Sequence, residues 1–143
     1  MLSNTSRYAL RAVIYLASKG DDGTRIGIKK IAEDLDIPSP FLGKILQTLA
    51  KKKLLLSTKG PNGGFAYPSD AKNVTLYDII TVIDGDELFT RCLLSDKNCH
   101  EEDNVCSMHN EYHTIRKEII TMFKGKTILE LAKANKKLEN IIY

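Results

Sequence analysis

The chain has 143 residues, of which 43% are hydrophobic, so it has the size and composition of one compact domain or of a small domain with an appended arm. No apolar run approaches the roughly 20 residues of a membrane span, and Arg7 and Arg11 interrupt the N-terminal apolar stretch, which argues against a signal peptide. These features exclude a membrane protein and predict a cytoplasmic one, and the formal net charge of +3 allows nucleic acid as a partner.

A core helix is predicted over residues 4–19. Ala9, Val13 and Leu16 form one apolar stripe at helical spacing, and Tyr8 and Ala12 begin a second stripe beside it. The glycine-containing turn at residues 20–23 ends the element. Because both stripes are apolar, the helix is expected to be covered on two sides.

Two shorter helices joined by a tight turn follow. Ile28, Ile31 and Leu35 mark the buried face of the first, and Ser39 is expected to cap the second, with Pro40 at its first helical position. This arrangement is typical of a helix-turn-helix, whose second helix enters the DNA major groove; a solvated face that binds nothing is the alternative. The residues of the second helix expected to contact DNA are Ser39, Pro40, Gly43, Lys44, Gln47, Thr48 and Lys51.

A lysine run and a glycine-rich hairpin come directly after these helices. Residues 51–53 are lysines, and residues 54–58 and 65–67 are predicted to pair as strands. A slim hairpin tip with a lysine can lie along the DNA backbone or enter the minor groove. The tip residues expected to contact DNA are Lys59, Gly60, Pro61, Asn62, Gly63 and Gly64. The succession predicts a mainly α protein with a small β-hairpin, organised as a winged helix-turn-helix.

The C-terminal part is predicted to be helical. A capping box at Thr75 and Asp78 begins one helix, and another at Thr127 and Glu130 begins the last. Between them, apolar residues step by four and three positions, which is the spacing of a helix that pairs with a partner helix; packing onto the chain's own domain is the alternative. The residues of this expected dimer seam are Met108, Tyr112, Ile115, Ile119 and Met122. Three units are expected: a DNA-binding domain at 1–84, a sensor loop at 85–106, and a long dimerisation helix with a C-terminal helix at 107–143.

All three cysteines lie in one short polar segment. Six residues separate Cys92 from Cys99 and Cys99 from Cys106, and His109 follows. Because disulfides are rare in a reducing compartment, an odd number of cysteines there indicates metal binding or redox chemistry. Thiolates and imidazole bind iron–sulfur clusters and zinc, although structural zinc sites usually contain closely paired cysteines, which are missing here. A metal-free thiol switch is the third interpretation.

Three strings in the sequence resemble the Rrf-two family of bacterial transcription regulators: RYA at residues 7–9, IAEDLDIPSPFLGKILQTL at residues 31–49, and KGPNGGF at residues 59–65. The resemblance covers nearly the whole chain, and the wing string is its most specific part. It implies a homodimer that binds a palindromic operator in double-stranded DNA, with the long C-terminal helix of each subunit at the dimer interface.

The resemblance also suggests a cofactor. IscR-like members ligate a 2Fe–2S cluster with three cysteines and a histidine in the order of Cys92, Cys99, Cys106 and His109, although each gap here is one residue longer. His100 and His113 are alternative nitrogen ligands without the matching spacing. NsrR-like members use an acidic residue near the N-terminus, where this chain has Arg7, so their 4Fe–4S arrangement is disfavoured.

Two departures from the IscR pattern concern DNA recognition. Gly43 and Lys44 stand where IscR-like helices carry an acidic residue and glutamine, and Lys59 replaces an arginine of the wing. The operator sequence of the IscR-like members is therefore not transferred to this chain.

The sequence thus predicts a DNA-binding transcription regulator that senses iron–sulfur, redox or nitric-oxide status. Its expected partners are double-stranded DNA and a second copy of itself, with no membrane and no small-molecule substrate. An enzyme is disfavoured because no acid–base pair, phosphate-binding loop or nucleophile elbow is present. A zinc-binding or cluster-free regulator of the same family is the alternative. An electron-transfer protein, and an adaptor whose winged domain binds protein, are the other classes.

Overall fold

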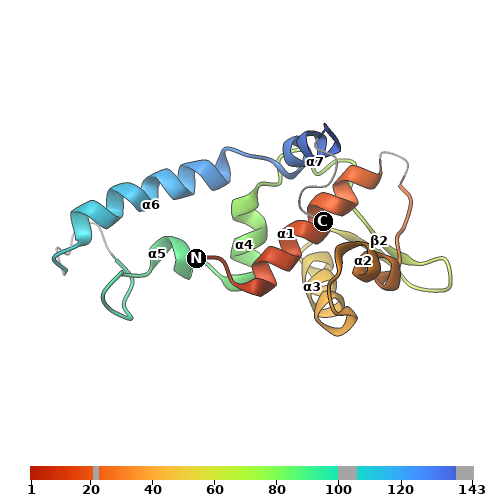
Figure 1. Ribbon diagram of the computed structural model, residues 1–143, viewed down its shortest axis with the longest axis horizontal. Helices are drawn as coiled ribbons and strands as arrows, with labels where there is room; N and C mark the ends of the chain where they lie inside the picture. Colours follow the sequence, from red (N-terminus) through yellow and green to blue (C-terminus); the bar gives the residue numbers. More distant parts are fainter. Residues whose placement is uncertain (21–22, 100–105, 138–143) are drawn as a thin grey trace.

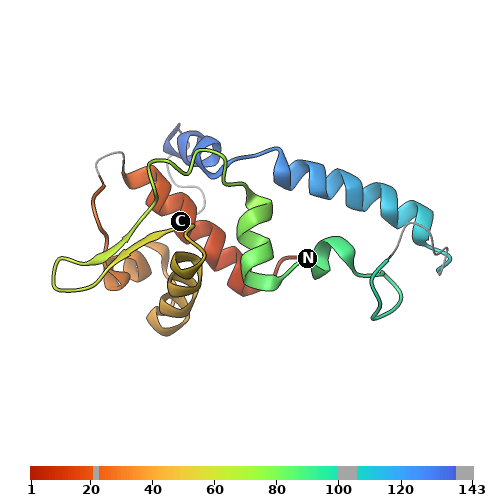
Figure 2. The same cartoon turned by 180° about the vertical axis from the view of Figure 1, so that it is seen from behind.

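The computed structural model describes residues 1–20, 23–99 and 106–137. Figures 1 and 2 show α1, α2, α3 and the β-hairpin gathered at one end of the molecule, while α6 extends along the longest axis toward the other end. The described elements, in chain order, are α1 (Asn4–Lys19), α2 (Ile28–Leu35), α3 (Ser39–Lys51), β1 (Leu56–Thr58), β2 (Gly64–Ala66), α4 (Leu76–Asp84), α5 (Glu87–Thr90), α6 (His109–Lys124) and α7 (Ile128–Lys137).

Helix α1 is the centre of the core, as its two apolar stripes predict. Ala9, Ala12 and Val13 are fully buried, and the helix packs against α3, α4 and α7. At its start, the Ser3 hydroxyl caps the helix by accepting a hydrogen bond from the Ser6 backbone N–H. The expected core helix covered on two sides is therefore confirmed.

The helix-turn-helix is present, but α3 begins differently from the prediction. Ser39 is already helical, Pro38 occupies the capping position, and no side chain caps the helix. The carbonyl of Pro38 accepts the N–H of Leu42 at 3.1 Å, so the backbone starts the helix one residue earlier and places Pro40 at its second position. Before the turn, Asp36 adopts a left-handed conformation with φ 51°, which ends α2.

The first strand of the hairpin is shorter than the sequence predicts, the second begins and ends one residue earlier, and a third segment joins them. Lys53 takes a positive φ of 60° after α3, and Leu55 is buried in the core, so regular pairing begins only at Leu56. On the other side of the hairpin, the backbone of Phe65 exchanges two hydrogen bonds with Ile26, at 2.8 and 2.9 Å. The wing is therefore anchored to the segment between α1 and α2.

Both predicted capping boxes form. Thr75 and Asp78 exchange side-chain and backbone hydrogen bonds at the start of α4, and Thr127 and Glu130 do the same at the start of α7. Helix α7 packs on α1 and contributes the fully buried Ile128 to the core, so it shares the core of residues 1–84. The boundary expected at residue 84 coincides with the end of α4, and the division into three units remains a prediction.

The beginning of the cysteine segment is helical, whereas the sequence led us to expect a loop. Residues 87–90 form the single turn α5, because Phe89 packs beside Phe123 of α6 and Tyr77 of α4, with ring centroids 6.0 and 4.5 Å apart. Two buried aromatic contacts thus order a turn that has no apolar periodicity of its own. None of the helices in the described part of the chain combines the length and apolar character needed to cross a bilayer.

Candidate sensor site and nucleic-acid interface

The exposed face of α3 carries most of the residues expected to contact DNA. The exposed residues are Ser39, Pro40, Lys44, Gln47, Thr48 and Lys51, whereas Gly43 is half-buried. A side-chain carbon on Gly43 would lie 3.8 Å from Ile28 of α2, so this glycine is on the side of α3 that faces α2. The Thr48 hydroxyl donates to the Lys44 carbonyl at 2.8 Å, which leaves Lys44 and Gln47 as the long polar groups of this face.

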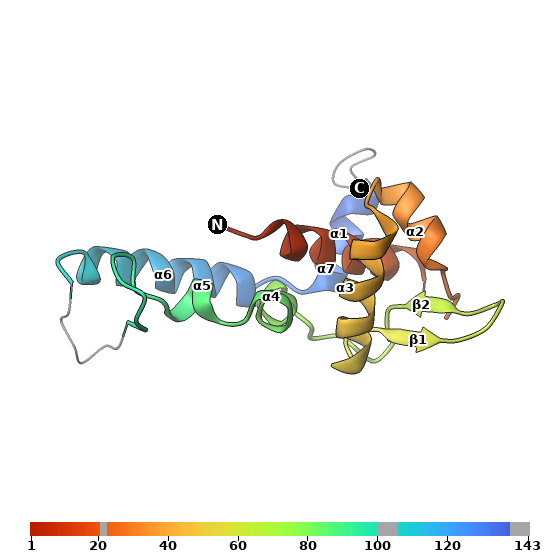
Figure 3. The same ribbon diagram turned by 90° about the horizontal axis from the view of Figure 1, so that it is seen from below.

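The wing tip divides into exposed residues and structural glycines. Lys59, Gly60, Pro61 and Asn62 are exposed at the end of the hairpin, which Figure 3 shows extending beside α3. A side-chain carbon on Gly63 would lie 2.2 Å from the Thr58 carbonyl oxygen, so this position admits only glycine. Gly63 is therefore needed for the fold of the hairpin, and its contact with DNA remains a prediction.

Two features near this face escaped the sequence reasoning. Arg25 precedes the strand-like Ile26, and its Nε donates to the Thr58 hydroxyl at 3.0 Å, which adds a cation to the base of the wing. Phe41 is 61% exposed at the start of α3, which adds an apolar ring to the face that carries Ser39, Pro40 and Lys44. The β-branched Ile26, between Arg25 and Gly27, is the one local signal for the added strand.

The four expected ligands lie at the end of the molecule opposite the wing, where α6 begins (Figure 1). Cys99 and His109 are in direct contact, with 3.0 Å between Sγ and Nδ1. His109 is buried in the first turn of α6 and stacks on His113, with ring centroids 5.6 Å apart. The imidazole is therefore held in place from both sides, between a thiol and a second ring.

Cys92 and Cys106 form a second pair. Hydrogen bonds from Ser95 and from the backbone at Leu94, together with one from the Cys106 thiol, lower the pKa of Cys92 to about 7. Partial burial and the charges of Cys92 and Cys99 raise the pKa of Cys106. The Cys106 thiol thus interacts with Cys92 and is within range of the charge of Cys99.

Backbone hydrogen bonds order the segment between the first two cysteines. The Cys92 N–H donates to the Lys97 carbonyl at 2.8 Å, and the Cys99 N–H donates to the Thr90 carbonyl at 2.7 Å. Cys99 is thereby tied to the end of α5. The expected alternative ligand His100 lies outside the described residues, and the ring of His113 stacks on that of His109.

The donor set suits a soft metal centre, but its members are not yet arranged around one point. Among residues 1–20, 23–99 and 106–137, no three histidine, cysteine or acidic side chains form a group that could hold a metal ion. The donors instead form the pairs Cys99–His109 and Cys92–Cys106. Three thiols and one imidazole are, as chemical types, ligands of an iron–sulfur cluster or of zinc.

The expected dimer seam is accessible along α6. Ile115 and Met122 are each 52% exposed and Met108 is 40% exposed, while Tyr112 and Ile119 are half-buried. This is an unusual concentration of exposed apolar side chains on one helix of a small protein.

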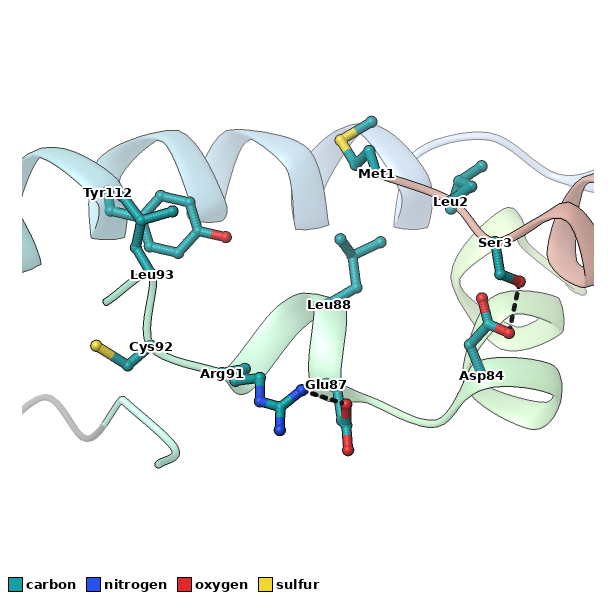
Figure 4. Close-up of a pocket in the computed structure, with 10 residues that line it drawn as sticks. All are labelled: Met1, Leu2, Ser3, Asp84, Glu87, Leu88, Arg91, Cys92, Leu93 and Tyr112. Atoms are coloured by element: carbon teal, nitrogen blue, oxygen red, sulfur yellow. Dashed lines mark hydrogen bonds and ion pairs between the residues drawn. The ribbon is translucent and has the colours of Figure 1, made fainter. Parts of the chain in front are cut away.

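A cavity of about 610 Å³ opens beside this seam, between α6, α5 and the N-terminal residues. Tyr112 and Cys92 line it. Figure 4 shows Leu88 pointing from α5 toward the N-terminal segment, and the hydrogen bond from Ser3 to Asp84 at one end. The seam, one cysteine and the start of the chain therefore border the same space.

The chain is similar to known proteins over almost its whole length. Residues 2–134 match the model of the family Rrf2, described as iron-dependent transcriptional regulators. A protein of Aquifex aeolicus named as an HTH-type transcriptional regulator is 36% identical over 138 residues, covering 96% of this chain and 94% of that protein. The HTH-type transcriptional regulator IscR of Yersinia pseudotuberculosis is 28% identical over 130 residues, covering 91% of this chain and 77% of IscR.

Solved structures show the same fold. CymR, the global cysteine regulator of Bacillus subtilis, superposes with a TM-score of 0.75 at 25% identity, covering 94% of this chain and 97% of CymR. The expected mainly helical winged fold is thereby confirmed, as is the expectation that the protein is a regulator and not an enzyme. The chain belongs to the Rrf2 family, the Rrf-two family of the sequence resemblance, and is a DNA-binding transcription regulator.

Proposed function

We propose that this cytoplasmic regulator binds a palindromic operator as a homodimer and senses iron–sulfur, redox or nitric-oxide status through Cys92, Cys99, Cys106 and His109. The observation that carries the proposal is the 3.0 Å contact between Cys99 and His109. It joins the cysteine segment to the first turn of α6, the helix that bears the expected dimer seam. Ligand binding at this point would therefore act directly on the subunit interface.

The cluster ligands would be the four named side chains. A 2Fe–2S cluster, when bound, supplies a one-electron redox centre whose potential depends on having an imidazole among its thiolate ligands. The protein's own contribution is to hold His109 buried against His113 and to keep the pKa of Cys92 near 7, so that a thiolate is available at neutral pH. Zinc in the same donor set is one alternative.

A chain of contacts leads from the cysteine segment toward the DNA-binding helices. Cys99 is bonded to Thr90 at the end of α5, and α5 follows directly after α4. At the end of α4, the Asp84 carboxylate accepts two hydrogen bonds of 2.7 Å from the start of α1. One comes from the hydroxyl of Ser3, the N-cap residue, and the other from the hydroxyl of Ser6 in the first turn. Helix α1 packs on α3, the expected recognition helix. A rearrangement of the sensor could therefore alter the spacing of two recognition helices in a dimer.

The proposal is tested by anaerobic purification of the full chain, followed by a visible absorption spectrum and analysis of iron, sulfide and zinc. We expect iron and sulfide in equal amounts, two of each per chain, with the absorption lost in Cys92→Ala and in His109→Ala. The matched control is Lys124→Ala, which changes an exposed residue in the last turn of the same helix and should keep the absorption. Colourless protein without iron, or zinc in place of iron, would refute the cluster.

The Cys92–Cys106 pair favours a second candidate, a cluster-free thiol switch. The lowered pKa of Cys92 increases its thiolate fraction and its reactivity toward oxidants, and Cys106, whose thiol interacts with that of Cys92, would resolve the oxidised form as a disulfide. Mass spectrometry of protein treated with hydrogen peroxide would detect a Cys92–Cys106 disulfide. Colourless protein that forms this disulfide and then changes its affinity for DNA would support the switch in place of the cluster.

A further inference from the structure

A second cavity lies on the flank of α6 away from the expected dimer seam. It has a volume of about 280 Å³ and is bounded by α5, by the segment that leads to Cys99 and by the middle of α6. The helical periodicity places Tyr112 and Ile119 on the seam side of α6 and Lys117 and Ile120 on the cavity side. Arg116 lies between these two sides and is buried. The two flanks of α6 therefore have different surroundings.

Arg116 lines this cavity and is unusual because its charged side chain is buried. The residue is 5% exposed, its Nη2 donates to the Arg91 carbonyl at 2.5 Å, and its guanidinium lies 4.6 Å from the centre of the Tyr112 ring. Its Nε is buried without a hydrogen-bond partner, and no ion pair within the described part of the chain includes it. Among the described residues this buried cation has no counterion, an arrangement that is costly, so an anion in the cavity would be stabilising.

The other lining groups indicate which kind of anion fits. Lys117 supplies a second cation, and no acidic side chain lines the cavity among the described residues. The Thr90 hydroxyl donates its single hydrogen to the Asp86 carbonyl at 3.2 Å, and the Asn98 side-chain amide, whose oxygen lies 3.4 Å from that hydroxyl, adds a polar group to the wall. Phe89, which is 3% exposed, and Ile120 supply apolar walls. Planar guanidinium groups bind carboxylates well, and the apolar walls suit a carbon chain.

We propose that this cavity binds a small organic carboxylate. The ligand would lie against Cys99, which also lines the cavity, and so beside one of the expected cluster ligands. By linkage, the carboxylate and the occupant of the Cys/His site would change each other's affinity. None of the expected seam residues lines the cavity, so a dimer formed through the seam would leave it open; this point alone rests on the proposed homodimer.

Isothermal titration calorimetry on the full, anaerobically purified protein tests the proposal. The probes are sodium acetate, sodium succinate, sodium sulfate and the neutral analogue succinamide, all at one ionic strength. We expect saturable binding of succinate or acetate at one per chain and no binding of succinamide. Loss of a charge-assisted hydrogen bond in Arg116→Met or Lys117→Ala should weaken binding about tenfold or more.

Lys124→Ala is the matched control, because Lys124 is an exposed lysine of the same helix that does not line the cavity. Lys117 is also exposed, so its replacement keeps the test independent of any effect of Arg116→Met on folding. Equal weakening in Lys117→Ala and Lys124→Ala would indicate unspecific charge attraction and overturn the proposal. It would also be overturned if no probe bound saturably or if sulfate bound and both carboxylates did not. The titration needs neither iron nor DNA, so its result is independent of the proposed sensor.

Discussion

A side-chain carbon on Gly64 would lie 2.4 Å from the carbonyl oxygen of Ile26, closer than such atoms can approach. The reason is that Phe65, the next residue, pairs with Ile26 through two backbone hydrogen bonds. Gly64 also has a φ of 143°, which residues with side chains rarely adopt. The wing is thus attached to the body of the protein at a position where only glycine fits.

Gly64→Ala should therefore destabilise the protein. Steric overlap with Ile26 and the unfavourable φ together are expected to lower the free energy of unfolding by about 2 kcal/mol or more. Gly43→Ala is the matched control: at this position in α3 the added carbon meets only ordinary contact distance, and helix propensity should raise stability by about 0.5–1 kcal/mol. Urea denaturation followed by circular dichroism measures both, and equal effects of the two changes would contradict the argument.

Lys44→Ala should weaken binding to operator DNA. Lys44 is exposed on α3 beside Gln47, so its loss should remove a contact made by each recognition helix. If the contact is to phosphate, the slope of log affinity against log salt should also become less steep by about one for each contact removed. Gel shifts or fluorescence anisotropy at several salt concentrations give the measurement.

Lys133→Ala controls for the loss of a positive charge, because Lys133 is exposed on α7 rather than on the recognition helix. If DNA binding were unchanged in Lys44→Ala, or equally weakened in both variants, the assignment of α3 as the recognition helix would be contradicted.

An acidic residue in the expected seam should separate the subunits. Ile115→Asp places a charge among the apolar side chains of α6, where it would have to be buried in a dimer. Because Ile115 is 52% exposed in the single chain, the stability of the monomer should change little. Sedimentation velocity should show monomers for this variant and dimers for the natural sequence.

The control for the seam is Leu94→Asp, which replaces a residue that is 61% exposed outside α6. Loss of the dimer in this variant as well, or retention of the dimer in Ile115→Asp, would place the interface elsewhere.

Stability above pH 10 should depend on Tyr67. Burial, and to a smaller extent the charge of Asp78, raises the pKa of Tyr67 from 10.0 to about 12. The unfolded chain therefore loses this proton first, so the contribution is fully present below pH 10 and is lost as the pH rises toward 12. A shift of this size corresponds to about 2–3 kcal/mol over that interval.

Tyr67→Phe should remove this part of the pH dependence, together with the 2.7 Å hydrogen bond from the Tyr67 hydroxyl to the Ala71 carbonyl. Denaturant titrations between pH 9 and 12 measure the difference, with Tyr8→Phe as a conservative control. Parallel stability curves for the natural sequence and Tyr67→Phe across this interval would contradict the raised pKa.

Local patterns in the sequence predicted much of the fold. Helix α1 begins and ends where its apolar stripes and flanking turn indicate, and both capping boxes form, because each depends on residues within a few positions of one another. The start of α3 was predicted one residue late, because the Pro38 carbonyl begins the helix in place of the Ser39 side chain. Pro38 and Ser39 are neighbouring candidates for the N-cap of α3, and the sequence alone does not distinguish between them.

Residue types and short spacings were enough to predict the family, the winged helix-turn-helix and the set of sulfur and nitrogen donors, because that information is local. Which donors interact depends on the folded chain: Cys99 contacts His109, and the Cys92 thiol interacts with that of Cys106, although neither pair is adjacent in the sequence. The same holds for the strand at Ile26, the turn α5 and the buried charge of Arg116. Each of these features depends on contacts between segments that are distant in the sequence, and the local spacing of residues does not predict such contacts.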